Sequence, residues 1–262
     1  MTWVNDLVTS RELHLPHLCA VDPTLHWANP PGGTAGRDSR PTFSTTPGPY
    51  TGPVPVVTHL HGGHSREESD GYPEAWYLPK ARDIPREYAR VGTYYERFAE
   101  RFRDRYGVRR RPRSATFVYD NDQRPAMLWY HDHTLGMTRA NVYAGLAGVY
   151  LLRGGSADLP SGVLPGPAPG RDGARGGHGV RSHEIPLVVQ DKSFTADGSV
   201  FFRGSRGYFG DTPPGGPWIP HTDVPPIWNP EFFGTTMVVN GNTWGPRPPS
   251  DRGRPVVAPA AG

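Results

Sequence analysis

Two short β-prone stretches, each ending in a His-x-His pair, constrain the fold of this chain more than any other feature. VPVVTHLH ends in His59 and His61, and AMLWYHDH ends in His131 and His133. On a strand, residues i and i+2 face the same way about 6.5–7 Å apart. Two imidazoles at that spacing can converge on one metal or straddle two adjacent metals. If the two strands lie side by side, all four rings meet at one point.

Imidazole is a ligand for copper, zinc, iron and nickel, and copper leads the affinity order of the divalent first-row metals. A single histidine is ordinarily a structural or surface residue, but two pairs at the ends of apolar strands favour metal binding. The remaining histidines outside these motifs lie in loop-like sequence and are interpreted as non-ligands: His14, His17, His26, His178, His183 and His221.

The rest of the sequence predicts an all-β protein rich in loops. Gly 33 and Pro 31 together make up about a quarter of the 262 residues, near the range of low-complexity sequence. No alternation of strands and helices is present, which favours an antiparallel sheet. One helical stretch is expected within residues 81–107, where Phe98, Phe102 and Tyr106 share a face. Strands are expected at residues 54–60, 115–119, 126–131, 142–153, 185–189, 199–202 and 235–240, with a turn at 120–123.

Charge and cysteine content exclude several classes. The net charge is only +3, and no basic run is interleaved with aromatics as in nucleic-acid binders. The densest basic segment, residues 101–113, is interpreted as a solvated loop or helix end. The one cysteine, Cys19, allows no internal disulfide. No membrane span or signal peptide is visible, so the default expectation is a cytoplasmic protein without nucleic-acid or membrane partners.

A zinc hydrolase is an open alternative, because the first pair extends to the run HLHGGH with His59, His61 and His64. The metallo-β-lactamase pattern HxHxDH is similar, but Gly63 stands where that pattern has its aspartate. An amidohydrolase also begins with an HxH pair, yet needs an α/β barrel that this pattern does not support. The only nearby carboxylate candidate in sequence is Asp70.

Four longer segments carry a family resemblance: THLHGGHSREESDGYPEAW, LWYHDHTLGMTRANVYAGLAGVYLLR, EIPLVVQDKSFTADGSVFF and PEFFGTTMVVNGNTW. They closely resemble multicopper oxidases, in particular the group of spore-coat laccases, bilirubin oxidase and phenoxazinone synthase. The match runs in order from about Trp3 to Trp244. Segments of this length are far more specific than an isolated HxH pair.

The resemblance implies a cupredoxin-like Greek-key β-sandwich fold, with one near-complete domain and an incomplete second one. Residues 1–153 would form the first, plastocyanin-like domain, carrying both HxH motifs and lacking its first strands. Residues 154–183 would be a Gly/Pro-rich linker, 184–244 the start of a second domain, and 245–262 a disordered tail.

The resemblance also assigns roles by position. His59 matches a type 2 copper ligand, and His61, His131 and His133 match ligands of the type 3 copper pair. Asp70 matches an acidic residue thought to help deliver protons to the oxygen site. In the family, phenolic or aminophenolic donors reduce a type 1 copper, and a trinuclear copper cluster reduces O₂ to water.

This sequence departs from the family by lacking HxxHxH and HCH, the motifs that supply the other cluster ligands and the type 1 site. Cys19 is flanked by Leu18 and Ala20 and does not match the type 1 thiolate. We therefore expect an amino-terminal fragment, inactive alone, whose partner is a missing carboxy-terminal part of the same enzyme. The Arg/Pro/Gly-rich ending after VNGNTW suggests a frameshifted or truncated gene. A stand-alone metal-binding module without turnover is a further alternative.

Overall fold

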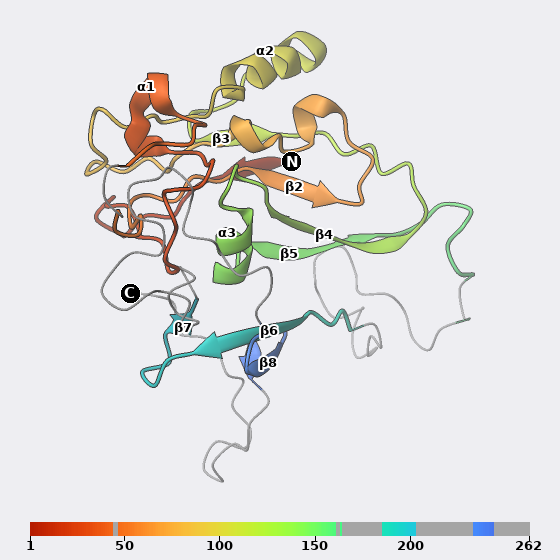
Figure 1. Cartoon of the computed structure of the whole chain (residues 1–262). Coiled ribbons are helices and arrows are strands. Elements are labelled where there is room, and N and C mark those ends of the chain that lie inside the picture. The colour runs from red at the N-terminus through yellow and green to blue at the C-terminus, as the bar shows by residue number, and fades with distance from the viewer. Residues whose placement is uncertain (44–46, 161–162, 164–184, 203–232, 244–262) are drawn as a thin grey trace.

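The structure, a computed structural model, describes residues 1–43, 47–160, 163, 185–202 and 233–243. Strands dominate and the helices are few and short (Figure 1). The helical elements are η1 (Pro30–Gly32), α1 (Gly33–Gly36), η2 (Glu67–Ser69), η3 (Pro73–Ala75), α2 (Tyr95–Tyr106) and α3 (Thr138–Ala144).

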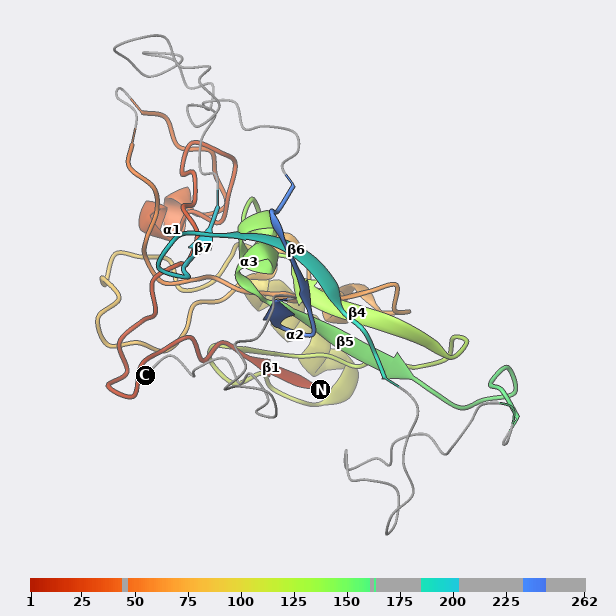
Figure 2. The ribbon, with the colours of Figure 1, turned by 90° about the horizontal axis from the view of Figure 1, so that it is seen from below.

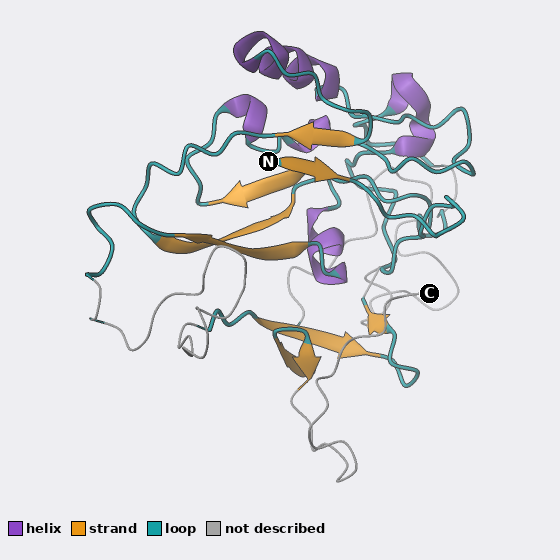
Figure 3. Ribbon diagram, turned by 180° about the vertical axis from the view of Figure 1, so that it is seen from behind, coloured by secondary structure: helices purple, strands orange, loops and turns teal. Residues whose placement is uncertain are grey.

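The amino-terminal part is built on two antiparallel sheets. One pairs β1 (Thr2–Val4) with β3 (Ser114–Thr116), and the other has the order β2 (Thr58–His61), β4 (Ala126–Asp132), β5 (Ala147–Leu152). Trp3 of β1 contacts Tyr130 of β4, with ring centroids 4.8 Å apart, so side chains link the two sheets. Figure 3 shows these strands in succession below α2.

Strand alternation divides the β2–β4–β5 sheet into two unlike faces. On the inner face, Leu60 is 2% exposed and belongs to the buried interior with Trp76 and Tyr77. On the outer face lie His59 and His61, the neighbours of Leu60 in β2. The core therefore holds β2 by its apolar residue and leaves both histidines on the other side.

Helix α2 forms where the spacing of aromatic residues predicts it. Phe98 and Phe102 are buried on its inner face, whereas Tyr106 at its end is half-buried. Glu96 in the first turn and Arg103 in the last match the helix dipole. Gly107 ends the helix in the left-handed conformation, with φ 68°.

A second sheet follows in the order β7 (Val200–Phe201), β6 (Val189–Phe194), β8 (Thr236–Val239), β9 (Asn242–Thr243). Tyr143 of α3 connects it to the first part. Its hydroxyl accepts a hydrogen bond from the Ser193 amide at 2.8 Å and donates to the Phe201 carbonyl at 2.9 Å. Figure 2 shows α3 close to β6 in a view from below.

The all-β class predicted from sequence is confirmed, but several element boundaries differ. Residues 142–144 belong to α3 rather than to a strand, because Gly145, with φ 117°, ends a helix that starts at Thr138. The predicted strands at 115–119 and 126–131 do not form a hairpin, since β3 pairs with β1 and β4 with β2 and β5. The strand expected at 185–189 begins only at Val189.

Most of the predicted linker at 154–183 and all of the predicted tail at 245–262 lie outside the described residues. In the described part of the chain, no helix has the length and apolar character needed to cross a membrane.

Candidate metal centre

Strands β2 and β4 bring the two His-x-His pairs together by their register. His59 lies opposite His131 and His61 lies opposite Trp129 in the antiparallel ladder. His133 follows the end of β4, and its amide donates to the Val57 carbonyl at 2.8 Å. Side-by-side placement, which the sequence could only assume, is therefore what the sheet provides.

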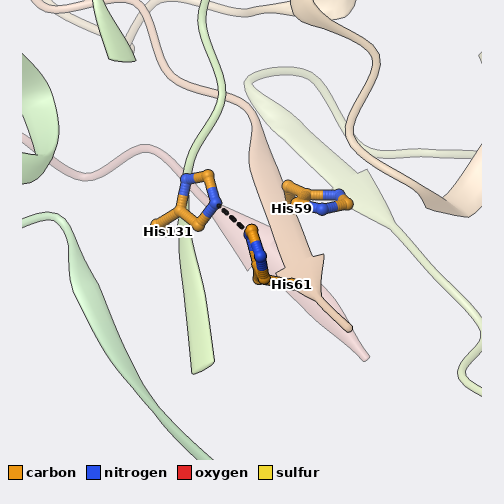
Figure 4. Close-up of side chains that lie close together, drawn as sticks. All are labelled: His59, His61 and His131. Atoms are coloured by element: carbon orange, nitrogen blue, oxygen red, sulfur yellow. Dashed lines mark hydrogen bonds between the residues drawn. The ribbon is translucent and has the colours of Figure 1, made fainter. Parts of the chain in front are cut away.

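The four imidazoles form one contiguous cluster. The His59 ring centroid lies 5.7 Å from His61, 5.4 Å from His131 and 4.8 Å from His133. Ligand nitrogens of His59, His61 and His131 all lie within 4.8 Å of one another. Figure 4 shows these three rings converging from β2 and β4. His133 joins the cluster through its stacking on His59 but is not part of that closest group.

Backbone carbonyls select the tautomer of three of these rings. Nδ1 of His59 donates to the Asp70 carbonyl at 2.6 Å, and Nδ1 of His133 donates to the Gly71 carbonyl at 2.8 Å. Nδ1 of His131 donates to the Asp132 carbonyl at 2.7 Å. Each bond commits the Nδ1 proton and leaves Nε2 unprotonated, which is the usual arrangement of a metal-binding histidine.

His61 differs from the other three rings, because its Nδ1 faces another imidazole and not a backbone carbonyl. Its Nδ1 lies 3.3 Å from Nε2 of His131, and Figure 4 marks this contact. Because the Nδ1 proton of His131 is committed, its Nε2 accepts the hydrogen bond from His61 Nδ1. The same lone pair of His131 is the one that a metal would take.

Burial and hydrogen bonding shift two of the imidazole pKa values in opposite directions. Burial, together with the neighbouring imidazoles, lowers the pKa of His131, which keeps it in the neutral, ligating form at pH 7. Hydrogen bonding to Asp70 raises the pKa of His59. The carboxylate Oδ1 of Asp70 lies 3.4 Å from His59 Nδ1, farther than the carbonyl of the same residue.

Asp70, the acid singled out by the sequence, therefore lies beside the cluster. Its side chain is 48% exposed, so it contacts both solvent and the His59 ring. The adjacent Gly71 has φ 77° and carries the carbonyl that orients His133. The SDG segment thus supports two of the four rings.

His64, the third member of the HLHGGH run, lies apart from this group. Its Nδ1 lies 2.8 Å from Oδ1 of Asp122, its amide donates to Oε1 of Gln123 at 2.8 Å, and its side chain is 65% exposed. Cys19 is buried, and burial raises the pKa of its thiol to about 11, so it is not a preformed thiolate.

The outer face of the sheet continues from the imidazoles into apolar surface. Trp129 lies 4.3 Å from the His131 ring and 5.0 Å from the His61 ring, and it is 40% exposed. Next to it along the strands, Met127 pairs with Leu151, and both are exposed. The cluster therefore lies on an open face rather than in an enclosed cavity.

The donor set fits a copper site. Metal–imidazole bonds are about 2 Å long, so two nitrogens on one ion are up to about 4 Å apart. A separation within 4.8 Å matches ligands that share one ion or bind two adjacent ions. Imidazole nitrogens suit copper, as they do zinc, iron and nickel, and copper leads the affinity order of the divalent first-row metals.

Sequence reasoning missed the residues behind this face. His17, interpreted as a non-ligand, is buried and hydrogen-bonded to Asn141, which in turn contacts Asp132 between the two histidines of the second pair. Strand alternation alone places Asp132 on the buried face. That signal was present in the HDH motif.

Fold and site together define a β protein that carries a cluster of histidines arranged for metal binding. A laccase of Bacillus stratosphericus is 31% identical over 246 residues, covering 92% of this chain and 33% of that protein. The multicopper oxidase LPR1 of Arabidopsis thaliana is 29% identical over 243 residues, covering 92% of this chain and 30% of that protein. Over 92% of its length the chain is therefore homologous to laccases and multicopper oxidases.

This chain spans about a third of the length of these relatives. No family model matches it. Among solved structures, McoA multicopper oxidase from Aquifex aeolicus overlaps with a TM-score of 0.37 and 19% identity, covering 73% of this chain and 28% of that one. An overlap this low supports no inference about the present chain.

Proposed function

We propose that this chain supplies four histidines of a trinuclear copper cluster in a laccase-like oxidase. His59 takes the type 2 position, and His61, His131 and His133 take type 3 positions. The complete enzyme oxidises phenolic or aminophenolic donors and reduces O₂ to water. Copper, when bound, supplies the one-electron chemistry that links donor to oxygen.

The observation that carries the proposal is the convergence of three ligand nitrogens, within 4.8 Å of one another, on one sheet face. Two strands and a shared register produce it, and three carbonyl contacts hold the tautomers. A family relationship over 92% of the chain explains why this face carries imidazoles.

In this proposal, some residues orient the imidazole rings and another exchanges protons with solvent. The carbonyls of Asp70, Gly71 and Asp132 orient the rings, and the half-exposed Asp70 carboxylate exchanges protons with solvent beside His59. The remaining ligands and the type 1 site come from outside these residues. The apolar surface around Trp129 is where the part that carries them would pack.

The same histidines could serve a metal-binding module or a zinc hydrolase. A metal-binding module without turnover would use the same four histidines and differ only in lacking a partner. A zinc hydrolase would need His64 beside His59 and His61, but His64 contacts Asp122 and Gln123 instead. Its position disfavours the hydrolase.

A copper titration tests the proposal. Cu(II) bound at the cluster should quench Trp129, whose ring lies 4.3 Å from His131, and give an EPR signal of nitrogen-ligated copper. We expect His131→Ala to weaken binding at least tenfold, because it removes a ligand. His64→Ala is the matched control and should bind like the parent chain. Trp129→Phe should lose the quenching but retain the copper.

Equal loss in the His64 and His131 variants, or copper content near zero in the parent chain, would contradict the proposal. Zinc-dependent ester or lactam hydrolysis abolished by His64→Ala would favour the hydrolase.

A further inference from the structure

Asp132 stands between two ligating positions, yet its side chain lies on the opposite face of the sheet. His131 and His133 flank it, and alternation along the strand turns its carboxylate toward the interior. Asp132 is 4% exposed. It cannot reach a metal bound by its neighbours, so any effect on such a metal must pass through the backbone.

The Asp132 carboxylate is fully used by hydrogen bonds. Oδ1 accepts from the Val57 amide at 3.0 Å and from the Thr134 hydroxyl at 2.8 Å. Oδ2 accepts from the Thr134 amide at 3.0 Å and from Asn141 Nδ2 at 2.8 Å. Both Thr134 and Asn141 have no exposed surface. One carboxylate thereby ties together β2, the end of β4 and helix α3.

Asn141 extends this network away from the sheet. Its Nδ2 also donates to the Pro55 carbonyl at 3.1 Å, just before β2. Its Oδ1 accepts from Nε2 of His17 at 2.7 Å. Nδ1 of His17 accepts from the Cys19 amide at 2.9 Å, which assigns the ring proton to Nε2 and so fixes which end of the Asn141 amide faces Asp132.

The buried charge of Asp132 makes the loss of any one hydrogen-bond donor to its carboxylate costly. Among the described residues, no lysine or arginine pairs with Asp132, so its charge is balanced by hydrogen bonds alone. A buried anion that loses one hydrogen-bond donor is strongly destabilised, because an uncompensated charge has a high free energy in a low dielectric. The backbone around the HDH motif must therefore stay where all four donors reach the carboxylate.

We propose that Asp132, Asn141 and His17 are positioning residues that fix the backbone of the HDH motif, and with it the spacing of His131, His133 and His59, for copper binding. This inference rests on the proposed function. Val57 and Pro55, which precede β2, are hydrogen-bonded to Asp132 and Asn141. The hydrogen-bond network therefore also fixes the strand register that sets His59 opposite His131.

The test compares two buried asparagines that make the same kind of contact. Asn141→Asp keeps the shape but replaces the Nδ2 donor with an oxygen facing Asp132 and the Pro55 carbonyl. Asn5→Asp is the matched control, since Asn5 is 2% exposed and its Nδ2 donates to the Val54 and Tyr77 carbonyls at 2.9 and 3.0 Å. Asn5 contacts no residue of the HDH motif through these bonds.

Both variants of the full chain should unfold more easily, but only Asn141→Asp should alter copper binding. We expect its Cu(II) affinity to fall about 10–100-fold, the range for residues that support metal ligands, with a changed copper hyperfine splitting in EPR. Thr134→Val is a gentler second variant that removes one hydroxyl donor. It should weaken copper binding measurably but less than Asn141→Asp, because it removes one donor to the Asp132 carboxylate without placing a second carboxyl group beside it.

Unchanged affinity and EPR spectrum in folded Asn141→Asp, or in Thr134→Val if the first variant does not fold, would overturn the positioning role and leave the proposed function standing. An equal loss of affinity in Asn5→Asp would also overturn it, because general destabilisation would then explain the effect. No copper binding by the parent chain would overturn both.

Discussion

Gly71 shows how closely single residues constrain this site. It has φ 77°, and a Cβ at this position would overlap the carbonyl oxygen of Thr58 in β2. Its own carbonyl orients His133. Only glycine combines this left-handed backbone with so close an approach to a strand.

Replacing Gly71 with alanine should therefore destabilise the fold by at least about 2 kcal/mol, since left-handed strain alone costs about 1–2 kcal/mol and the overlap with Thr58 adds to it. Gly107→Ala is the control, because Gly107 has φ 68° but no atom within 4 Å of a Cβ there. Urea unfolding should show the larger loss for Gly71→Ala. Equal losses would mean that contact with Thr58 is not the cause.

His17 gives the fold a defined sensitivity to acid. Burial lowers its pKa from the ordinary 6.5, although its hydrogen bond with Asn141 opposes the shift. The unfolded chain thus binds a proton at His17 more readily than the folded one. The stabilisation from a neutral His17 is present above pH 6.5 and is lost as the pH falls below it.

His17→Gln should remove this part of the acid sensitivity while retaining an amide donor for Asn141. We expect the variant to be less stable than the parent chain at pH 7, with a gap that narrows toward pH 5. Urea unfolding at intervals of pH measures both curves. His131 contributes to acid sensitivity in both proteins, so the difference isolates His17. Parallel curves would contradict the assignment.

At the scale of elements, strands β4 and β5 expose an apolar stripe beside the imidazoles. Met127 and Leu151 are cross-strand partners and are 55% and 42% exposed. An open apolar sheet face promotes association with other chains. We therefore expect this stripe to promote self-association of the chain.

The double variant Met127→Thr and Leu151→Thr should reduce self-association, because threonine keeps β propensity while removing apolar surface. Light scattering after size-exclusion chromatography should show a smaller mean mass and an unfolding temperature within a few degrees of the parent. Val108→Thr is the control, as Val108 is 46% exposed but lies outside the sheet. A monodisperse monomer of the parent chain would show that this stripe is not a point of association.

At the scale of the whole molecule, copper binding and turnover should separate. The sequence contains neither HxxHxH nor HCH, and its one cysteine is Cys19, whose buried thiol stays protonated. No group in it matches the site that accepts electrons from a donor. Under the proposed function, the four histidines would bind copper but would have no route for a phenolic electron.

The purified chain loaded with copper should therefore show no oxidation of a phenolic dye and no oxygen consumption, under conditions in which a complete laccase turns over. Oxygen-electrode traces and dye absorbance provide the readout. Turnover by this chain alone, abolished by His131→Ala, would show that half of the cluster ligands suffice.

The order of residues along the chain is enough to predict which side chains can share a site. Period-two alternation requires His59 and His61 to share a face, as do His131 and His133, because side-chain direction along a strand is a local property. Long motifs indicated the relationship to multicopper oxidases. Helix α2 could also be predicted from the sequence, since Phe98 and Phe102 follow a helical period that local backbone geometry imposes.

How these pieces meet depends instead on long-range packing. That β3 pairs with β1 rather than β4, and that His59 stands opposite His131, depends on contacts between residues far apart in sequence. The same holds for the buried link from His17 through Asn141 to Asp132. Local patterns specify which groups point inward or outward, whereas packing of the whole core selects the partner that each buried polar group finds.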